Sequence, residues 1–391
     1  MSAMCTFNTE SIVMVEPSQY ENESFSMSFA YGNDIGGSRN RSQQDRVKVM
    51  VSPDKKIVLL FVGDGHGIEH GELASETAQT NIEIELAANY LEAYTNPHNF
   101  LKQIIMNTHA SIRESIIKKC NRLVNPCYVN PDTGTLFHDI HFTRPIHGGT
   151  TITVLMIIND IMYCGNLGDS KAVLYSPTSC FLPKHKIGTT SISDVPSNYL
   201  DLIGDHSPEN ILEYKRMLAF RPSTVDPLKP MMKFEYDKNF EPIFANDSDG
   251  NVVVSGKKGA YYKNVSHEFG SLVSGPNDTS LAFTRSSGDF FLHEYGLTCE
   301  PDIFEIDIKS IMSQTNLVIG VIASDGVWDN MTDETVHEFV THSTCIDALS
   351  NVEGIQKIAS SFLTRNNLLG KINFGNSADN ASAIVFSITK K

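Results

Sequence analysis

Apolar runs separated by polar turns recur along most of the chain and predict antiparallel strands. Residues 25–31 form a strand-like stretch, and residues 47–51 and 57–62 are β-branched and aliphatic runs. A Ser-Pro-Asp turn separates the last two runs, which is typical of a hairpin. The same pattern predicts further strands at residues 151–158, 161–164, 171–175, 317–323 and 381–388.

Apolar side chains recur at helical spacing between residues 73 and 91, and again between residues 101 and 116. We expect two long amphipathic helices there. Two shorter helices are predicted near the end of the chain, one that Thr332 begins as N-cap and one around residues 355–362. Strands linked by short turns, together with separate helices, indicate an α+β protein.

Three stretches depart from this pattern. Residues 1–24 are expected to be a flexible N-terminal lead-in. Residues of about 121–146 and 220–280 exceed ordinary loop lengths and are interpreted as insertions. The second of these has an Asp249-Gly250 pair between apolar residues, which predicts a hairpin.

The composition is that of a globular protein, with 41% hydrophobic and 20% charged residues in 391. Lys and Arg number 31 and Asp and Glu 46, and the resulting net charge of −15 argues against nucleic acid as a partner. No apolar run is long enough to span a membrane, and residues 1–24 do not resemble a secretory signal. Seven scattered cysteines without a CxxC pair suggest reduced thiols. We therefore expect a cytoplasmic protein, with the nucleus as the alternative compartment.

Four aspartates stand at ends of predicted strands. Asp64 and Asp325 follow apolar runs, whereas Asp169 and Asp379 come just before them. In an antiparallel sheet the end of one strand lies beside the start of its neighbour, so these carboxylates are expected to converge. Converging carboxylates repel each other unless a cation binds between them, and oxygen ligands suit Mg²⁺ or Mn²⁺. For any single Asp-Gly pair, however, a plain turn is the alternative interpretation.

A histidine accompanies the first of these aspartates. His66 follows Asp64 by two residues, and an imidazole at the edge of an acidic cluster could protonate a leaving group. An exposed histidine beside a turn is the other interpretation.

Seven motifs, in order along the chain, resemble those of the metal-dependent protein phosphatases of the type 2C family. They are Asp-Gly-His-Gly at 64–67, His-Gly-Gly-Thr-Thr at 147–151, Gly-Asn-Leu-Gly-Asp-Ser-Lys-Ala at 165–172, Asp-His-Ser-Pro at 205–208 with Glu213 and Arg216, Thr-Arg-Ser-Ser-Gly-Asp at 284–289, Ala-Ser-Asp-Gly-Val-Trp-Asp at 323–329 and Asp-Asn at 379–380.

The resemblance implies a two-sheet antiparallel β-sandwich flanked by α-helices, with αββα layers, as a single phosphatase catalytic domain over residues 25–391. It also implies a protein serine/threonine phosphatase that acts on phosphoserine and phosphothreonine with a water activated by two Mg²⁺ or Mn²⁺ ions. The expected partners are phosphoprotein substrates, and the protein is expected to be a monomer.

Site residues carry over from the same resemblance. Asp64 would bridge two ions and the Gly65 carbonyl would bind one of them. Asp325 and Asp379 would complete the other, Asp169 would help to hold a third and weaker ion, and Asp45 also belongs to the metal ligands. His66 would be the general acid, acting with Asp64 as the catalytic pair.

The sequence departs from the family in the segment before Asp45. Gln44 replaces an acidic residue, and Asn40 stands where the phosphate-binding arginine belongs, so Arg39 or Arg41 would have to bind the substrate phosphate. These changes favour an alternative, a catalytically weak pseudophosphatase that acts as a regulatory binding module. A metal-dependent hydrolase of small phosphoesters is a third candidate.

His138, His141, His147 and Cys127 are residue types that can bind zinc. Two histidines three apart with one distant cysteine are not a tight ligand spacing, and exposed loop residues are the preferred interpretation.

Overall fold

The computed structural model describes residues 12–15, 17–37, 39, 42–122, 126–181, 197–220, 231–237, 241–349 and 352–391. Arg41, one of the two predicted phosphate ligands, lies outside these residues.

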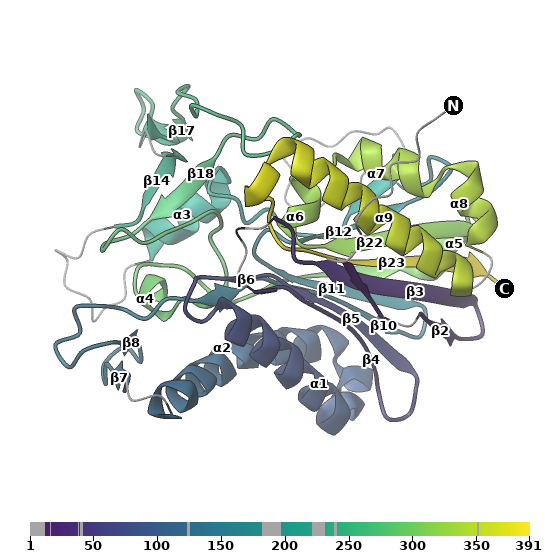
Figure 1. Cartoon of the computed structure of the whole chain (residues 1–391), viewed down its shortest axis with the longest axis horizontal. Helices are drawn as coiled ribbons and strands as arrows, with labels where there is room; N and C mark the ends of the chain where they lie inside the picture. Colours follow the sequence, from purple (N-terminus) through teal and green to yellow (C-terminus); the bar gives the residue numbers. More distant parts are fainter. Residues whose placement is uncertain are drawn as a thin grey trace.

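Two antiparallel sheets form the centre of the protein (Figure 1). The larger has, in spatial order, β1 (Ile12–Met14), β3 (Phe25–Asp34), β23 (Ala381–Lys390), β22 (Leu317–Ala323), β12 (Lys171–Tyr175) and β13 (Tyr199–Asp201), with β2 (Ser18–Glu21) also paired to β3. The smaller has β21 (Asp302–Asp307), β11 (Ile161–Leu167), β10 (Ile152–Ile158), β5 (Ile57–Gly63) and β4 (Arg46–Val51).

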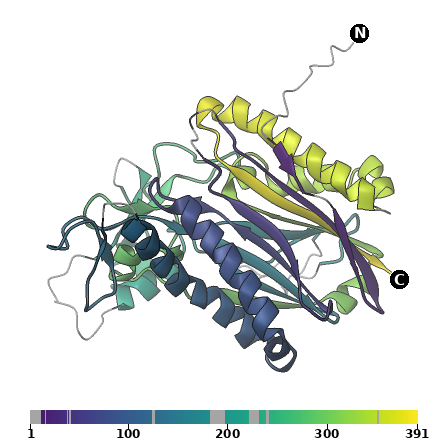
Figure 2. The same ribbon diagram turned by 60° about the horizontal axis from the view of Figure 1, so that its bottom comes forward.

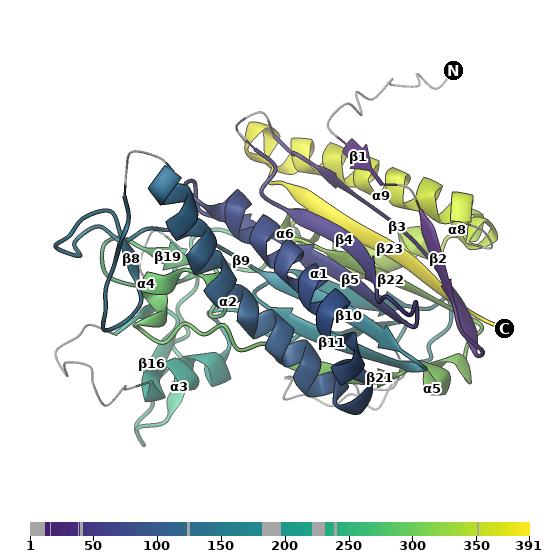
Figure 3. The ribbon, with the colours of Figure 1, turned by 90° about the horizontal axis from the view of Figure 1, so that it is seen from below.

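Side chains that alternate along these strands fill the space between the sheets, where Phe29 and Phe386 of one sheet meet Leu60 and Leu155 of the other. The opposite face of the smaller sheet packs against α1 (Gly71–Thr95) and α2 (Pro97–Arg122), through residues such as Ile82 (Figure 3). These two helices span the segments whose apolar spacing predicts two long helices.

The outer face of the larger sheet is covered by helices from the last part of the chain, as Figure 2 shows. They are α6 (Asp325–Trp328), α7 (Asp333–Val340), α8 (Ser343–Ala348) and α9 (Val352–Asn373). Thr332 is the N-cap of α7, and its side chain accepts from the Thr335 amide. The predicted sandwich of two sheets between helical layers is thus confirmed.

Order starts earlier than the sequence suggested. Residues 12–14 and 18–21, placed in the flexible lead-in, form β1 and β2, which both pair with β3. The expectation of an irregular lead-in is therefore wrong for these residues. Their backbone groups pair with opposite ends of the long β3, and segments this short do not reveal such a long-range pairing.

The long insertion, together with the short helix just before it, forms a lobe beside the end of the sandwich where β6 (Gly65–His66) and α6 lie (Figure 1). The predicted hairpin is present, with β16 (Phe244–Asn246) paired to β17 (Val252–Val254). The core of the lobe includes Tyr214, Phe234 and Phe244. Its other elements are α3 (Ile211–Ala219), β14 (Lys233–Tyr236), β15 (Glu241–Pro242), β18 (Ser271–Ser274) and β19 (Ser280–Leu281).

The remaining elements are short. They are β7 (Tyr128–Val129), β8 (Leu136–Phe137), β9 (Gly149–Thr150), β20 (Ser287–Gly288), α4 (Phe290–His293), α5 (Ile308–Met312) and the 3₁₀ helix η3 (Gly375–Ser377). Among the described residues, no helix combines the length and the apolar character needed to cross a bilayer.

Candidate active site

The predicted aspartates meet at one end of the sandwich. Asp169 comes just before β12, Asp325 follows β22 by two residues, and Asp379 comes shortly before β23. Ala323 at the end of β22 pairs with both Lys171 in β12 and Ala383 in β23, so the three strands bring their aspartates to the same edge. This is the antiparallel relationship on which the prediction rested.

Asp64 reaches this edge from the other sheet, between β5 and β6. Its buried carboxyl group lies close enough to those of Asp45, Asp325 and Asp379 for their charges to act on it. Burial is the largest cause that raises the pKa of Asp64 and of Asp325 well above the ordinary value. The charges of Asp45, Asp325 and Asp379 add to it for Asp64, and those of Asp169, Asp329 and Asp379 add to it for Asp325.

The acidic cluster is chemically incomplete by itself. Asp45 is fully buried and accepts a hydrogen bond of 2.7 Å from Ser324 Oγ, but its other oxygen has no partner. Oδ1 of Asp325 is also buried and unpartnered. Orphaned carboxylate oxygens in one acidic cluster fit a hard divalent cation, which would both neutralise the charges and complete their bonding.

Gly65 occupies a position that no other residue could take. A Cβ atom there would lie 2.3 Å from the Gly71 carbonyl oxygen and 2.7 Å from that of Gln44. Gln44 has a bracing role, because its side-chain amide donates to the Gly67 carbonyl at 3.1 Å and its backbone N–H donates to Asn380 Oδ1 at 2.8 Å. It thus links the Asp-Gly-His-Gly turn to the segment around Asp379.

His66 is held by a residue that the sequence analysis did not single out. Its Nε2 lies 2.6 Å from Oδ2 of Asp289, which also accepts a 2.6 Å bond from Ser286 Oγ. A small sheet of β6, β9 and β20 brings the two together, because β9 lies between them. Burial alone would lower the pKa of His66, but the charge and hydrogen bond of Asp289 outweigh it and raise that pKa.

Gly149 in β9 leaves room for this pair. A Cβ atom at that position would lie 2.2 Å from Oδ2 of Asp289. Asp289 itself has left-handed backbone angles, with φ of 45°, which an Asp adopts at a cost. The surrounding contacts therefore hold Asp289 in a conformation that aims its carboxylate at His66.

A second acidic group lines a pocket of about 430 Å³ next to the first. It contains Asp169, Asp325 and Asp329, and the insertion contributes Lys263 and Asn264. Burial is the largest cause that raises the pKa of Asp329 to about 7. The ammonium of Lys263 interacts with all three carboxylates, which outweigh its burial and raise its pKa.

Neither Asp329 nor Lys263 was assigned a role from sequence. Asp329 is the last residue of the motif at 323–329 and follows Asp325 by four residues, at the end of α6. This spacing was the sequence feature that could have indicated its place in the site. Nothing local marks Lys263, because the insertion has no regular pattern there. The backbone bond from Val265 N–H to the Asp329 carbonyl, at 3.2 Å, fixes this part of the insertion against the site.

A network of hydrogen bonds and ion pairs reaches Gly168, the residue before Asp169. The His206 ring accepts from the Gly168 N–H at 3.1 Å and lies 3.2 Å from Asp302. Arg285 then joins Asp302, at 2.8 Å, to Glu213, at 2.6 Å. The motifs at 205–216 and 284–289 therefore come together as one scaffold.

Arg39 is exposed and donates to Ser377 Oγ at 2.8 Å, in the η3 segment that precedes Asp379. The guanidinium therefore lies near the acidic edge but is bonded to the protein.

Comparisons with known proteins agree with this geometry. The family described as Protein phosphatase 2C matches residues 52–220 and 264–359, and the gap between the two matches lies within the insertion. Two Arabidopsis thaliana proteins are similar: probable protein phosphatase 2C 65, 35% identical over 86 residues, and probable protein phosphatase 2C 35, 26% identical over 207 residues. These matches cover 22% and 52% of this chain, and 21% and 47% of the relatives' own lengths.

Two solved structures share the fold. A serine-threonine phosphatase 2C from Toxoplasma gondii has a TM-score of 0.56 and 17% identity, covering 97% of this chain and 99% of that one. A sex determining protein of C. elegans has a TM-score of 0.51 and 17% identity, covering 96% of this chain and 65% of that one.

Proposed function

The chain belongs to the protein phosphatase 2C family, and from this premise we propose that it is a Mg²⁺- or Mn²⁺-dependent protein serine/threonine phosphatase. The observation that carries the proposal is the meeting, at one edge of the sandwich, of a buried acidic cluster with an imidazole held by its own carboxylate. Hydrolysis of a phosphomonoester needs these two parts, a cation site for the phosphoryl group and a proton source for the leaving oxygen.

Asp64 is the proposed ligand shared by two ions. The Gly65 carbonyl would bind one of them, Asp325 and Asp379 would complete the other, and Asp45 would support the cluster. Bound there, Mg²⁺ or Mn²⁺ would supply a Lewis acid and lower the pKa of a water molecule. The chain's own contribution is to hold these carboxylates together at a mutual electrostatic cost that a bound cation relieves.

His66 is the proposed general acid and Asp289 the residue that positions it. Because Nε2 of His66 is bonded to Asp289, its Nδ1 is the atom from which a proton would pass to the departing serine or threonine oxygen. A general acid contributes typically about 10²- to 10⁴-fold to rate.

Two further roles are proposed around the cluster. Arg39 would exchange its bond to Ser377 for the substrate phosphate, a group that suits the planar guanidinium. Asp169 and Asp329 would hold a third cation, in competition with the ammonium of Lys263.

The insertion lobe lines the outer pocket and is the proposed determinant of which phosphoprotein binds. We further propose that the protein is located in the cytoplasm or nucleus, since the cysteines among the described residues are free thiols. We also propose that it is a monomer.

The direct test is phosphate release from a phosphothreonine peptide with Mn²⁺, with Mg²⁺ and with neither. We expect turnover that requires the ion and is lost in Asp325→Asn. Asp249→Asn is the matched control, because Asp249 is exposed in the β16–β17 turn, and it should retain wild-type turnover. Circular dichroism of each variant establishes that the fold is unchanged.

Two other outcomes would select the alternatives. Folded protein without turnover under any condition would contradict the phosphatase proposal and favour a binding module, which the departures at Gln44 and Asn40 support. Turnover of p-nitrophenyl phosphate far above that of any phosphopeptide would favour a hydrolase of small esters.

A further inference from the structure

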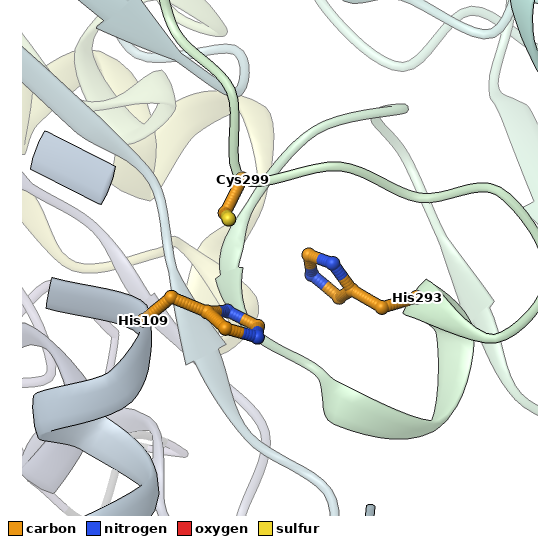
Figure 4. Close-up of side chains that lie close together, drawn as sticks. All are labelled: His109, His293 and Cys299. Carbon is orange, nitrogen blue, oxygen red and sulfur yellow. The ribbon is translucent and has the colours of Figure 1, made fainter. Parts of the chain in front are cut away.

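Three side chains with nitrogen and sulfur ligand atoms converge outside the proposed catalytic residues. His109 comes from α2, His293 ends α4, and Cys299 precedes β21. One ligand atom from each lies within 4.8 Å of the other two. Figure 4 shows the three side chains turned toward a common point.

One of the two imidazoles has a ring nitrogen that makes no hydrogen bond. Nε2 of His293 is buried and has no hydrogen-bond partner among the described residues. A buried imidazole nitrogen without a partner costs free energy unless something binds it. It is a second indication of a ligand, independent of the convergence itself.

Both imidazoles are in the form that binds metal. Burial is the largest cause that lowers the pKa of His109 to about 3 and that of His293 to about 4, so both rings are neutral at physiological pH. Burial also raises the pKa of the Cys299 thiol, which would lose its proton only when a cation binds.

We propose that His109, His293 and Cys299 form a site for a borderline divalent cation such as Zn²⁺. Two imidazoles and one thiolate are ligands that zinc prefers, whereas Mg²⁺ and Mn²⁺ prefer oxygen. The chain thereby has two cation sites of different chemistry, and an excess of Mg²⁺ does not compete for this one. A fourth position is left for water or an external ligand.

The site is coupled to the proposed general acid through one hydrogen bond. The Gly288 N–H donates to Nδ1 of His109 at 3.2 Å, and Gly288 immediately precedes Asp289. A neutral imidazole has a single lone pair. If His109 binds metal through Nδ1, that lone pair is used; if it binds through Nε2, Nδ1 carries the proton. In either case the bond from Gly288 is lost.

Metal binding should therefore loosen the turn that holds Asp289 against His66. Gly288 and Asp289 both have positive φ, of 95° and 45°, and depend on their contacts to stay so. We expect the cation to inhibit turnover. This consequence rests on the proposed phosphatase function, but the binding of the metal does not.

The binding test uses Co²⁺ as a spectroscopic probe, added to the full chain in excess Mg²⁺ so that the oxygen sites are filled. A thiolate ligand gives a charge-transfer band in the near ultraviolet, which we expect at one Co²⁺ per chain and which one equivalent of Zn²⁺ should abolish. Cys299→Ser should lose the band. The control Cys345→Ser, in α8, should keep it.

His293→Gln should weaken Co²⁺ binding by at least the roughly 10- to 100-fold that even an outer-shell partner costs. His138→Gln is the matched control, because His138 pairs with Glu69 at 3.1 Å outside this cluster. No band in the wild type, or a band that survives in Cys299→Ser, would overturn the site. Thermal melts establish that the variants are folded.

Inhibition is measured separately, by titrating Zn²⁺ into the peptide assay at saturating Mn²⁺. Wild type and Cys345→Ser should be inhibited at lower Zn²⁺ than Cys299→Ser. Equal inhibition of all three would overturn the coupling. If the protein has no phosphatase activity, the Co²⁺ band still decides whether the site exists.

Discussion

His66 and Asp289 are 223 positions apart in the chain, and their side chains meet at 2.6 Å. The middle strand of a small sheet, β9, pairs with β6 on one side and β20 on the other. It thereby brings the Asp-Gly-His-Gly turn next to the end of the motif at 284–289. Burial alone would raise the pKa of Asp289, but the charge and hydrogen bond of His66 outweigh burial and lower that pKa below its ordinary value. The carboxyl group therefore stays ionised at a lower pH than that of an ordinary Asp. The pair is therefore a charged unit on which the proposed proton transfer depends.

Asp289→Asn should lower kcat and leave KM for a phosphopeptide nearly unchanged, because Asp289 orients His66 and does not touch the substrate. The loss should not exceed the roughly 10²- to 10⁴-fold attributed to a general acid. Steady-state kinetics of Asp289→Asn beside His66→Gln measures this, with Asp249→Asn as the control. A rise in KM at constant kcat would contradict the positioning role.

Gly149→Ala should reproduce much of the same defect without removing a polar group. The added Cβ would meet Oδ2 of Asp289 at 2.2 Å, so the carboxylate must move away from His66. We expect a fall in kcat and a modest loss of thermal stability. Gly250→Ala makes a useful comparison, because nothing lies within 4 Å of a Cβ there, and its kcat should be that of the wild type.

Glu213 makes the fold sensitive to acid. Although burial acts in the opposite direction, hydrogen bonds and charges from Arg285 and Arg216 lower the pKa of Glu213 to about 2, from an ordinary 4.5. The folded state thus binds this proton more weakly than the unfolded chain. The stabilisation is fully present above about pH 4.5 and is lost as pH falls toward 2.

Glu213→Gln should accordingly cost about 3–5 kcal/mol of unfolding free energy at pH 7, since it leaves two arginines without their buried partner. Urea unfolding from pH 7 to pH 4 measures the difference from wild type, which should shrink as the pH drops below about 4.5. A difference that stays constant with pH would mean that the charge of Glu213 is not responsible.

Lys263→Met should strengthen the binding of Mn²⁺ to the outer acidic group, because it removes a fixed positive charge that interacts with Asp169, Asp325 and Asp329. One charge of this kind is expected to change affinity roughly tenfold, about 1.4 kcal/mol. Calorimetric titration with Mn²⁺ gives the affinity directly. Lys257→Met, an exposed lysine of the same insertion that pairs with Glu241, should leave it unchanged.

Much of the fold could be predicted because its information is local. Alternation and helical spacing marked the strands and the two long helices, and the aspartates at strand ends marked the acidic edge. The short strands β1 and β2 were missed because their order comes from pairing with β3, not from their own composition. The zinc ligands set aside in sequence, His138, His141, His147 and Cys127, form no metal-sized group within the described part of the chain.

The sequence by itself determined which segments become strands and helices, and which carboxylates stand where strands end, because both depend on residues a few positions apart. Only the tertiary structure decided the partners of the catalytic groups. Asp289 beside His66, Lys263 beside Asp329, and the union of His109 with His293 and Cys299 each join distant segments. Such contacts are set by how sheets and insertions pack in space, and no pattern within a single segment records them.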